Sequence, residues 1–184
     1  MVTLKDKYDE ASEWYEQKYV EGGWETNPYM KDEYDAHKFW LKRKFPGKII
    51  SLGVGSGQDI PILNMPHPHY FVGYDISEGM LNNAKKKFPD YKFKLADCSK
   101  PINDECNVLV SMFGTPNYIG LPKLLNHYKA FKASHAFFVF YGEWYKDGFD
   151  ENCYFYTKEQ LQLELKEYKP IIEPLNENYY IVKW

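Results

Sequence analysis

Cysteines, long apolar runs and an excess of charge of one sign are all scarce in this sequence, and each scarcity excludes a class of protein. The three cysteines, Cys98, Cys106 and Cys153, form no C-x-x-C pair, which argues against a disulfide framework and favours a reducing, cytoplasmic location. The longest apolar run, residues 136–141, is far shorter than a membrane span, and the first ten residues lack the apolar segment of a signal peptide. A net charge of -3 without a basic stripe does not favour a nucleic-acid partner. We therefore expect a cytoplasmic protein that contacts neither membrane nor nucleic acid.

The second feature is the alternation of short β-rich runs with helical patterns from Lys48 onward, which is typical of an α/β fold. It predicts a doubly wound, seven-stranded, mostly parallel sheet. The last strand is expected to be antiparallel, because the turn-forming residues 176–178 suit a hairpin. The predicted strands are residues 48–53, 70–75, 91–96, 107–112, 135–141, 170–174 and 179–184.

The segment before Lys48 has a helical pattern without strands. Tyr8, Ala11 and Tyr15 share one helical face, and residues 34–45 predict a second helix. The length of 184 residues suits one domain. We therefore predict a single domain over residues 1–184, with an N-terminal helical cap (1–47) and an α/β core (48–184).

Three alternating glycines, Gly53, Gly55 and Gly57, follow the first predicted strand and lead into a helical pattern at residues 57–63. Glycine permits positive φ and lets a ligand approach bare backbone, while a helix N-terminus offers free N–H groups to an anion. A purely structural turn could use the same residues. The spacing G-x-G-x-G disfavours a dinucleotide site, whose third glycine would fall at Gln58.

Two carboxylates follow the next two predicted strands, at the sheet edge where ligands of doubly wound folds bind. Asp75 stands where a carboxylate can accept both hydroxyls of a ribose; alternatively, it caps a helix that begins near Ser77. Asp97 can accept the exocyclic amine of adenine; alternatively, it is a solvated turn residue. Together with the glycines, these residues indicate an adenosine-containing ligand.

These motifs resemble those of class I S-adenosylmethionine (SAM)-dependent methyltransferases over nearly the whole chain. Residues 50–57 are similar to the first motif of the family, residues 72–77 with 80–81 to the second, residues 96–97 to the third and residues 108–114 to the fourth. The resemblance implies that SAM is the cofactor, with its methionine moiety near the three glycines, its ribose on Asp75 and its adenine amine on Asp97. Further cofactor contacts are assigned in or beside the motifs, at Ile76, Met80, Cys98 and Ser111. Residues 8–15 are similar to the N-terminal helix of the family, which closes over the methionine end of SAM, and this resemblance adds Tyr15.

The fourth motif also bears on the methyl acceptor. Its Ser-Met-Phe-Gly at residues 111–114 differs from the Asp/Asn-Pro-Pro-aromatic signature of enzymes that methylate nucleobase or amide nitrogens, so the resemblance favours a small-molecule acceptor. The chain has 17 Tyr, 12 Phe and 5 Trp, more than its core requires, and aromatic walls suit a flat or cationic acceptor. We assign acceptor contacts to Tyr15, Tyr118, Glu143 and Trp144.

Two other functions use the same motifs. A non-catalytic SAM-binding protein would keep the glycines and carboxylates but lack acceptor chemistry. An NAD-dependent oxidoreductase would use the same fold, but the spacing of the glycines argues against this function. His67 and His69 lie close together in a loop, but without a third ligand nearby we expect no metal site.

Overall fold

The computed structural model describes residues 3–21, 31, 35, 47–58, 60, 67–143 and 153–184. The chain forms two compact units, Met1–Cys98 and Ser99–Trp184. The single domain over residues 1–184 stays a prediction. No helix among the described residues is long and apolar enough to cross a membrane.

The first unit contains three parallel strands, β1 (Ile49–Leu52), β2 (Phe71–Asp75) and β3 (Lys92–Leu95). Every residue of β1 and β2 is buried, whereas β3 is partly exposed. Parallel strands that are covered on both faces have nearly continuous apolar sequences, as the Ile-Ile-Ser-Leu of β1 does. Burial of these apolar side chains stabilises the sheet and fixes where its strand ends lie.

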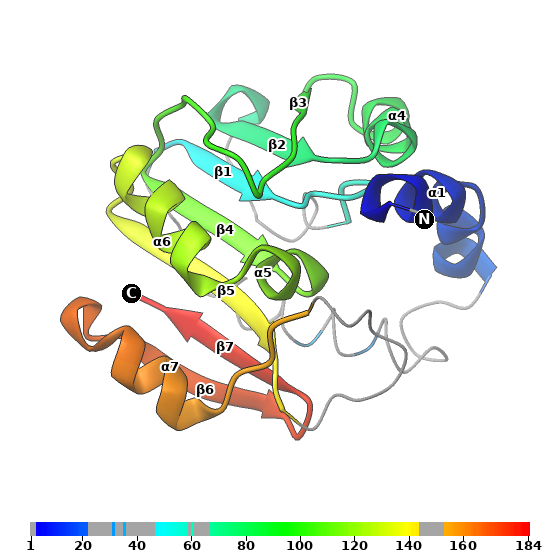
Figure 1. Cartoon of the computed structure of the whole chain (residues 1–184). Coiled ribbons are helices and arrows are strands. Elements are labelled where there is room, and N and C mark those ends of the chain that lie inside the picture. The colour runs from blue at the N-terminus through cyan, green and yellow to red at the C-terminus, as the bar shows by residue number, and fades with distance from the viewer. Residues whose placement is uncertain are drawn as a thin grey trace. The chain divides into compact units, whose positions relative to one another are not determined.

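Among its described residues, the first unit has the helices α1 (Leu4–Glu21) and α4 (Glu78–Lys87) and a short 3₁₀ turn η1 (Pro68–Tyr70). Ser77 is the N-cap of α4, as its hydroxyl accepts a hydrogen bond from the Met80 amide at 3.1 Å. The buried stripe of α4 is Met80, Leu81 and Ala84. Figure 1 shows α1 (blue) beside α4 (green), and the contacts described below join them.

The second unit begins with β4 (Val108–Met112), α5 (Gly114–Ile119), α6 (Leu121–Ala130) and β5 (His135–Tyr141), and β4 pairs with β5 in parallel. It continues with α7 (Lys158–Glu164), the 3₁₀ turn η2 (Lys166–Tyr168), β6 (Ile171–Asn176) and β7 (Tyr179–Lys183). β7 is antiparallel to both β5 and β6. The predicted capping box of Thr157 and Gln160 is present at the start of α7.

The strand order is β3-β2-β1-β4-β5-β7-β6 in a seven-stranded sheet. The order runs outward from β1 to β3 and in the other direction from β4, which is the doubly wound pattern. The mostly parallel α/β sheet with a reversed last strand, β7, is therefore confirmed.

Two details of the helices differ from the prediction. Gly57, Gln58 and Ile60 lie in turns and bends rather than at the start of a helix, since Gly57 has φ of +81°. The rest of that predicted helix and nearly all of the second N-terminal helix lie outside the described residues. The sequence did not predict α5, which follows directly after Phe113.

Candidate functional site

The glycine loop, residues 53–57, leaves β1 and folds back over the end of β2. Gly53, Gly55 and Gly57 have φ of +77°, +54° and +81°, a region that favours glycine. The amides of Gly53 and Val54 both donate to the carbonyl oxygen of Tyr74, at 2.7 and 3.0 Å. The loop is thus a fixed turn that needs glycine at every second position.

The glycines of this loop meet different surroundings. A Cβ on Gly57 would lie 3.0 Å from the Phe88 ring, so that glycine is required by packing as well as by φ. A Cβ on Gly55 would have Gln58 Oε1, at 3.8 Å, as its nearest described neighbour. Bare backbone without a side chain of its own is the environment that a ligand needs in order to approach the main chain.

Asp75 connects this loop to the beginning of α4. Its Oδ2 accepts a hydrogen bond from the Gly55 amide at 2.8 Å, and its Oδ1 accepts one from the Ser77 amide at 2.9 Å. Burial raises the pKa of Asp75 above its ordinary value, while the amides of Ser77 and Gly55 act in the opposite direction. Each carboxylate oxygen has two lone pairs, so both oxygens keep the capacity to accept a further hydrogen bond from a ligand hydroxyl.

The helix-cap alternative for Asp75 is answered in part by this geometry. The N-cap of α4 is Ser77, and Asp75 contributes by accepting the amide hydrogen of that cap residue. Asp75 therefore supports the start of the helix without occupying the cap position. This role leaves its predicted contact with a ribose open.

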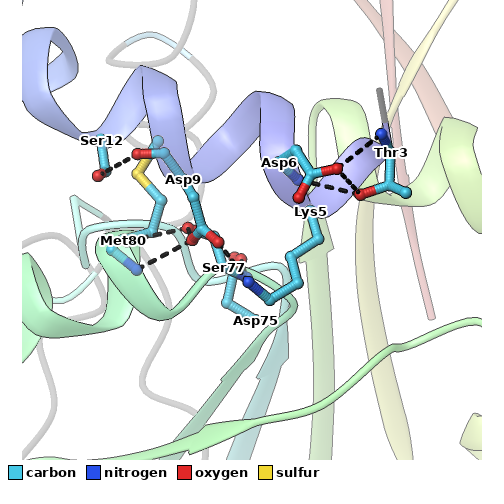
Figure 2. Close-up of polar contacts among 9 residues, drawn as sticks. Thr3, Lys5, Asp6, Asp9, Ser12, Asp75, Ser77 and Met80 are labelled. Carbon is cyan, nitrogen blue, oxygen red and sulfur yellow. Dashed lines mark hydrogen bonds and ion pairs between the residues drawn. The ribbon is translucent and has the colours of Figure 1, made fainter. Parts of the chain in front are cut away.

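Asp9 joins α1 to the same helix start (Figure 2). Its Oδ1 accepts hydrogen bonds from the Ser77 hydroxyl at 2.6 Å and from the Gly79 amide at 3.1 Å, and its Oδ2 pairs with Lys5 at 2.5 Å. Burial acts to raise the pKa of Asp9, but the hydrogen bonds from Lys5, Ser77 and Gly79 outweigh it and lower the pKa to about 2. The side chain is therefore a carboxylate at neutral pH.

The residues after β3 complete the site within the first unit. The Ala96 amide donates to the carbonyl oxygen of Asp75 at 2.8 Å, and Asp97 follows, half-buried. Cys98 is buried beside the same strand end. Burial and then the Asp75 charge raise the pKa of the Cys98 thiol to about 12, so this cysteine is an inert packing group at neutral pH.

The other predicted site residues fall into three sets. In the first unit, Tyr15 on α1 and Ile76 are half-buried, and Met80 is fully buried on α4. In the second unit, Ser111 is fully buried within β4, Tyr118 is half-buried on α5 and Glu143 is exposed after β5. Trp144 lies outside the described residues. The structure thus brings the glycines together with Asp75, and the contacts of all these side chains with a ligand stay predictions.

Sequence reasoning missed Asn117, which organises the second unit. Its side chain is fully buried on α5. It exchanges hydrogen bonds with both the amide and the carbonyl of Tyr141, at 3.0 and 3.2 Å, and donates to the Tyr154 carbonyl at 2.5 Å. This residue fixes the end of β5 and the start of the segment that follows residues 144–152.

Aromatic rings gather at the same end of β4 and β5. Phe113 directly follows β4 with φ of +54°, a strained conformation for a residue other than glycine. Its ring meets Tyr179 edge-on, with centroids 5.5 Å apart, and Tyr179 also contacts Tyr141 at 5.3 Å. No group of three or more His, Cys, Asp or Glu side chains within the described ranges is arranged to hold a metal ion.

Comparison with known proteins agrees with this architecture. A family model described as a methyltransferase domain matches residues 50–133, the part that contains the glycine loop and Asp75. No curated protein sequence gives a significant match.

Several solved structures share the fold. A complex of DhpI with SAM and HEP has a TM-score of 0.72 and 11% identity, covering 97% of this chain and 94% of that one. Magnesium protoporphyrin IX methyltransferase (ChlM) from Synechocystis PCC 6803, with bound S-adenosylhomocysteine (SAH), has a TM-score of 0.67 and 15% identity, covering 98% and 96%. A complex between the Haloferax volcanii Trm112 methyltransferase activator and a putative methyltransferase gives 0.68 and 14%, covering 94% and 78%. The chain thus resembles methyltransferases in a family model over residues 50–133 and shares the fold of class I SAM-dependent methyltransferases.

Proposed function

We propose that the protein transfers the methyl group of SAM to a small-molecule acceptor. The observation that carries the proposal is the glycine loop, whose Gly55 amide donates a hydrogen bond to the buried carboxylate of Asp75. This arrangement sets a turn of bare backbone beside a carboxylate that can still accept hydrogen bonds. Structures of the same fold with SAM or SAH bound support SAM as the cofactor.

The residues of the first unit fit the parts of this cofactor. The bare backbone at Gly55 suits the approach of a ligand to the loop, and the carboxylate of Asp75 suits two ribose hydroxyls. Asp97 lies two residues beyond Leu95, the residue that pairs with Asp75 in the sheet, so it suits a group farther along the ligand, the adenine amine. Ile76, half-buried beside Asp75, can pack against the nucleoside.

When bound, SAM supplies an electrophilic methyl group on a sulfonium, which a nucleophile attacks in line. The task of the protein is then to hold the acceptor at about 3 Å in the right direction and to exclude water. A general base is needed only if the acceptor loses a proton early. Placement can therefore carry much of the rate.

The aromatic residues of the second unit support a small acceptor. The rings of Phe113 and Tyr141 both contact Tyr179 at the end of β4 and β5. Tyr118 lies on the neighbouring α5, and Tyr154 lies on the segment that Asn117 holds. Ring faces favour flat apolar groups and cations, by about 0.5–2 kcal/mol for each cation contact. We propose Tyr118 and Glu143, with Tyr15 and Trp144, as acceptor contacts.

Transfer of a labelled methyl group tests the proposal. The protein is incubated with methyl-labelled SAM and a panel of planar aromatic acceptors, aliphatic amines and carboxylic acids, and both SAH and labelled product are measured. Turnover with at least one member is expected. Binding of SAH without turnover on any acceptor would favour the non-catalytic SAM-binding protein.

Melting curves test the identity of the cofactor without any acceptor present. SAH at one hundred times its dissociation constant should stabilise the protein by about 2.7 kcal/mol, whereas NAD should not. Asp97→Ala should weaken SAH binding about tenfold or more, because a charged acceptor is lost. Asp90→Ala is the matched control, as Asp90 lies exposed in a turn of the same unit. Stabilisation by NAD and not by SAH would contradict the proposed cofactor.

A further inference from the structure

Helix α1 is attached to the start of α4 through the side chain of Asp9. Asp9 lies 68 residues from Ser77 and 70 from Gly79 in the sequence, yet its Oδ1 accepts hydrogen bonds from both. The first amides of a helix have no partners within the helix. In α4, Ser77 caps the Met80 amide and Asp9 supplies an acceptor from another helix for the Gly79 amide.

The contact between the two helices is unusually close at Gly79. A Cβ there would lie 2.3 Å from Ser12 Oγ and 3.0 Å from Ser12 Cβ. The Ser12 hydroxyl donates to the Asp9 carbonyl at 2.6 Å, and Asn83 Nδ2 donates to the Ser12 carbonyl at 2.9 Å. Glycine at position 79 therefore allows α1 to approach near enough for the Asp9 carboxylate to reach the helix start.

Ser77 connects this contact to Asp75. Its hydroxyl donates to Asp9, while its amide donates to Asp75 Oδ1. Asp75 in turn holds the Gly55 amide through Oδ2 (Figure 2 shows Asp9, Ser77 and Asp75 together). A continuous series of hydrogen bonds thus runs from α1 through the start of α4 to the glycine loop, within one compact unit.

We infer that Asp9 is a positioning residue, which couples the docking of α1 to cofactor binding by holding Ser77 where its amide orients the Asp75 carboxylate. The inference rests on the proposed function, since Asp75 is the proposed ribose acceptor. Asp9 itself touches no cofactor in this scheme. Release of Asp9 frees Ser77 to change its position, so that Asp75 loses its fixed orientation and the ribose hydroxyls lose an aligned acceptor.

Coupling of this kind is reciprocal. If docked α1 raises the affinity for SAH by some factor, bound SAH must favour docked α1 by the same factor. A merely structural contact would stabilise α1 equally with and without SAH. Hydrogen exchange of the α1 amides therefore separates the two roles.

The experiment compares four proteins: wild type, Asp9→Ala, Asp9→Asn and Asp6→Ala. Asp6 accepts hydrogen bonds from Thr3 at the exposed beginning of α1, so its loss frays the same helix without touching α4. Calorimetry gives the SAH dissociation constant, and hydrogen exchange with mass spectrometry gives the protection of α1 with and without saturating SAH. Circular dichroism checks that each variant is folded.

Asp9→Ala is expected to weaken SAH binding about tenfold or more, because two hydrogen bonds to a carboxylate are lost. Asp6→Ala should change the affinity less than about twofold. Asp9→Asn keeps an oxygen that can accept both bonds and should recover most of the loss. SAH should protect α1 in the wild type and fail to protect it in Asp9→Ala.

Two results would overturn the inference, and they differ from each other. If wild type binds SAH and Asp9→Ala binds it equally well while α1 exchanges faster, the contact is structural only. If Asp9→Ala is unfolded, hydrogen exchange of the wild type decides: equal protection of α1 with and without saturating SAH has the same meaning. If wild type binds no SAH, the proposed function fails as well.

Discussion

Gly73 in the middle of β2 gives a direct test of how the glycine loop is positioned. A Cβ at this residue would lie 2.8 and 2.9 Å from the two methyl groups of Val54 and 3.0 Å from its Cβ. Gly73 pairs with Ser51 on β1 and Phe93 on β3, so its own backbone is held on both sides. Rotation of the valine side chain does not move its Cβ, and the loop backbone must therefore shift in a Gly73→Ala variant.

The change in the free energy of unfolding caused by Gly73→Ala follows from two opposing effects. Overpacking a buried site costs about 1–3 kcal/mol. Replacing glycine by alanine restricts the unfolded chain and returns about 0.4–1 kcal/mol. We expect a net loss of about 1–2 kcal/mol in the free energy of unfolding. SAH affinity should also fall about tenfold, because displacement of Val54 disturbs the hydrogen bonds of the loop with the Tyr74 carbonyl.

The assay is urea denaturation of wild type, Gly73→Ala, Val54→Ala and the double variant, with SAH calorimetry on each. Val54→Ala removes the two methyl groups that make the closest contacts, so the double variant should show a favourable coupling energy of about 1 kcal/mol or more. Additive effects of the two substitutions, or a Gly73→Ala protein with unchanged stability and SAH affinity, would refute this explanation of Gly73.

Three further predictions concern individual side chains. Asn117→Ala should lower the free energy of unfolding by about 2–4 kcal/mol in urea denaturation, because backbone groups of Tyr141 and Tyr154 lose their partners; a loss below about 0.5 kcal/mol would contradict this role. The pKa of Asp9 is lowered from 3.8 to about 2, so its contribution to stability is present above pH 3.8 and is lost as the pH falls toward 2. The melting temperature should thus fall less steeply from pH 4 to 2 in Asp9→Asn than in wild type, and parallel curves would count against the bonds of Asp9. Because the pKa of Cys98 is raised to about 12, alkylation of the native protein at pH 8 should modify half-buried Cys153 before Cys98, as mass spectrometry of peptides would show; equal rates would mean that Cys98 is exposed to reagent.

The fold could be predicted from sequence because its elements have strong local signals. The strands are short apolar runs, β7 is reached through a hairpin at residues 176–178, and α7 starts with a capping box. The place of Asp75 against the glycine loop could be predicted, because a carboxylate at the end of a strand next to such a loop has a recognisable position. These signals depend on neighbours in the sequence.

Residues whose partners lie far away in the sequence gave no such signal. Asp9 is one polar residue on a helix with an apolar face, and its partner Ser77 is 68 residues away. Nothing in the sequence around Gly73 indicates that the Val54 side chain packs directly against it. Asn117 lies on α5, whose Gly-Thr-Pro start resembles a loop and follows the strained Phe113. Packing and hydrogen bonds across the fold, rather than local propensity, determine these positions.

The central claim is that the glycine loop and Asp75 hold SAM, and a crystal structure of the protein with SAH tests it most directly. We expect the ribose hydroxyls within hydrogen-bonding distance of the Asp75 carboxylate and the methionine-derived end of SAH beside Gly53–Gly57. A structure in which SAH binds elsewhere, or in which Asp75 makes no contact with the ribose, would contradict the claim.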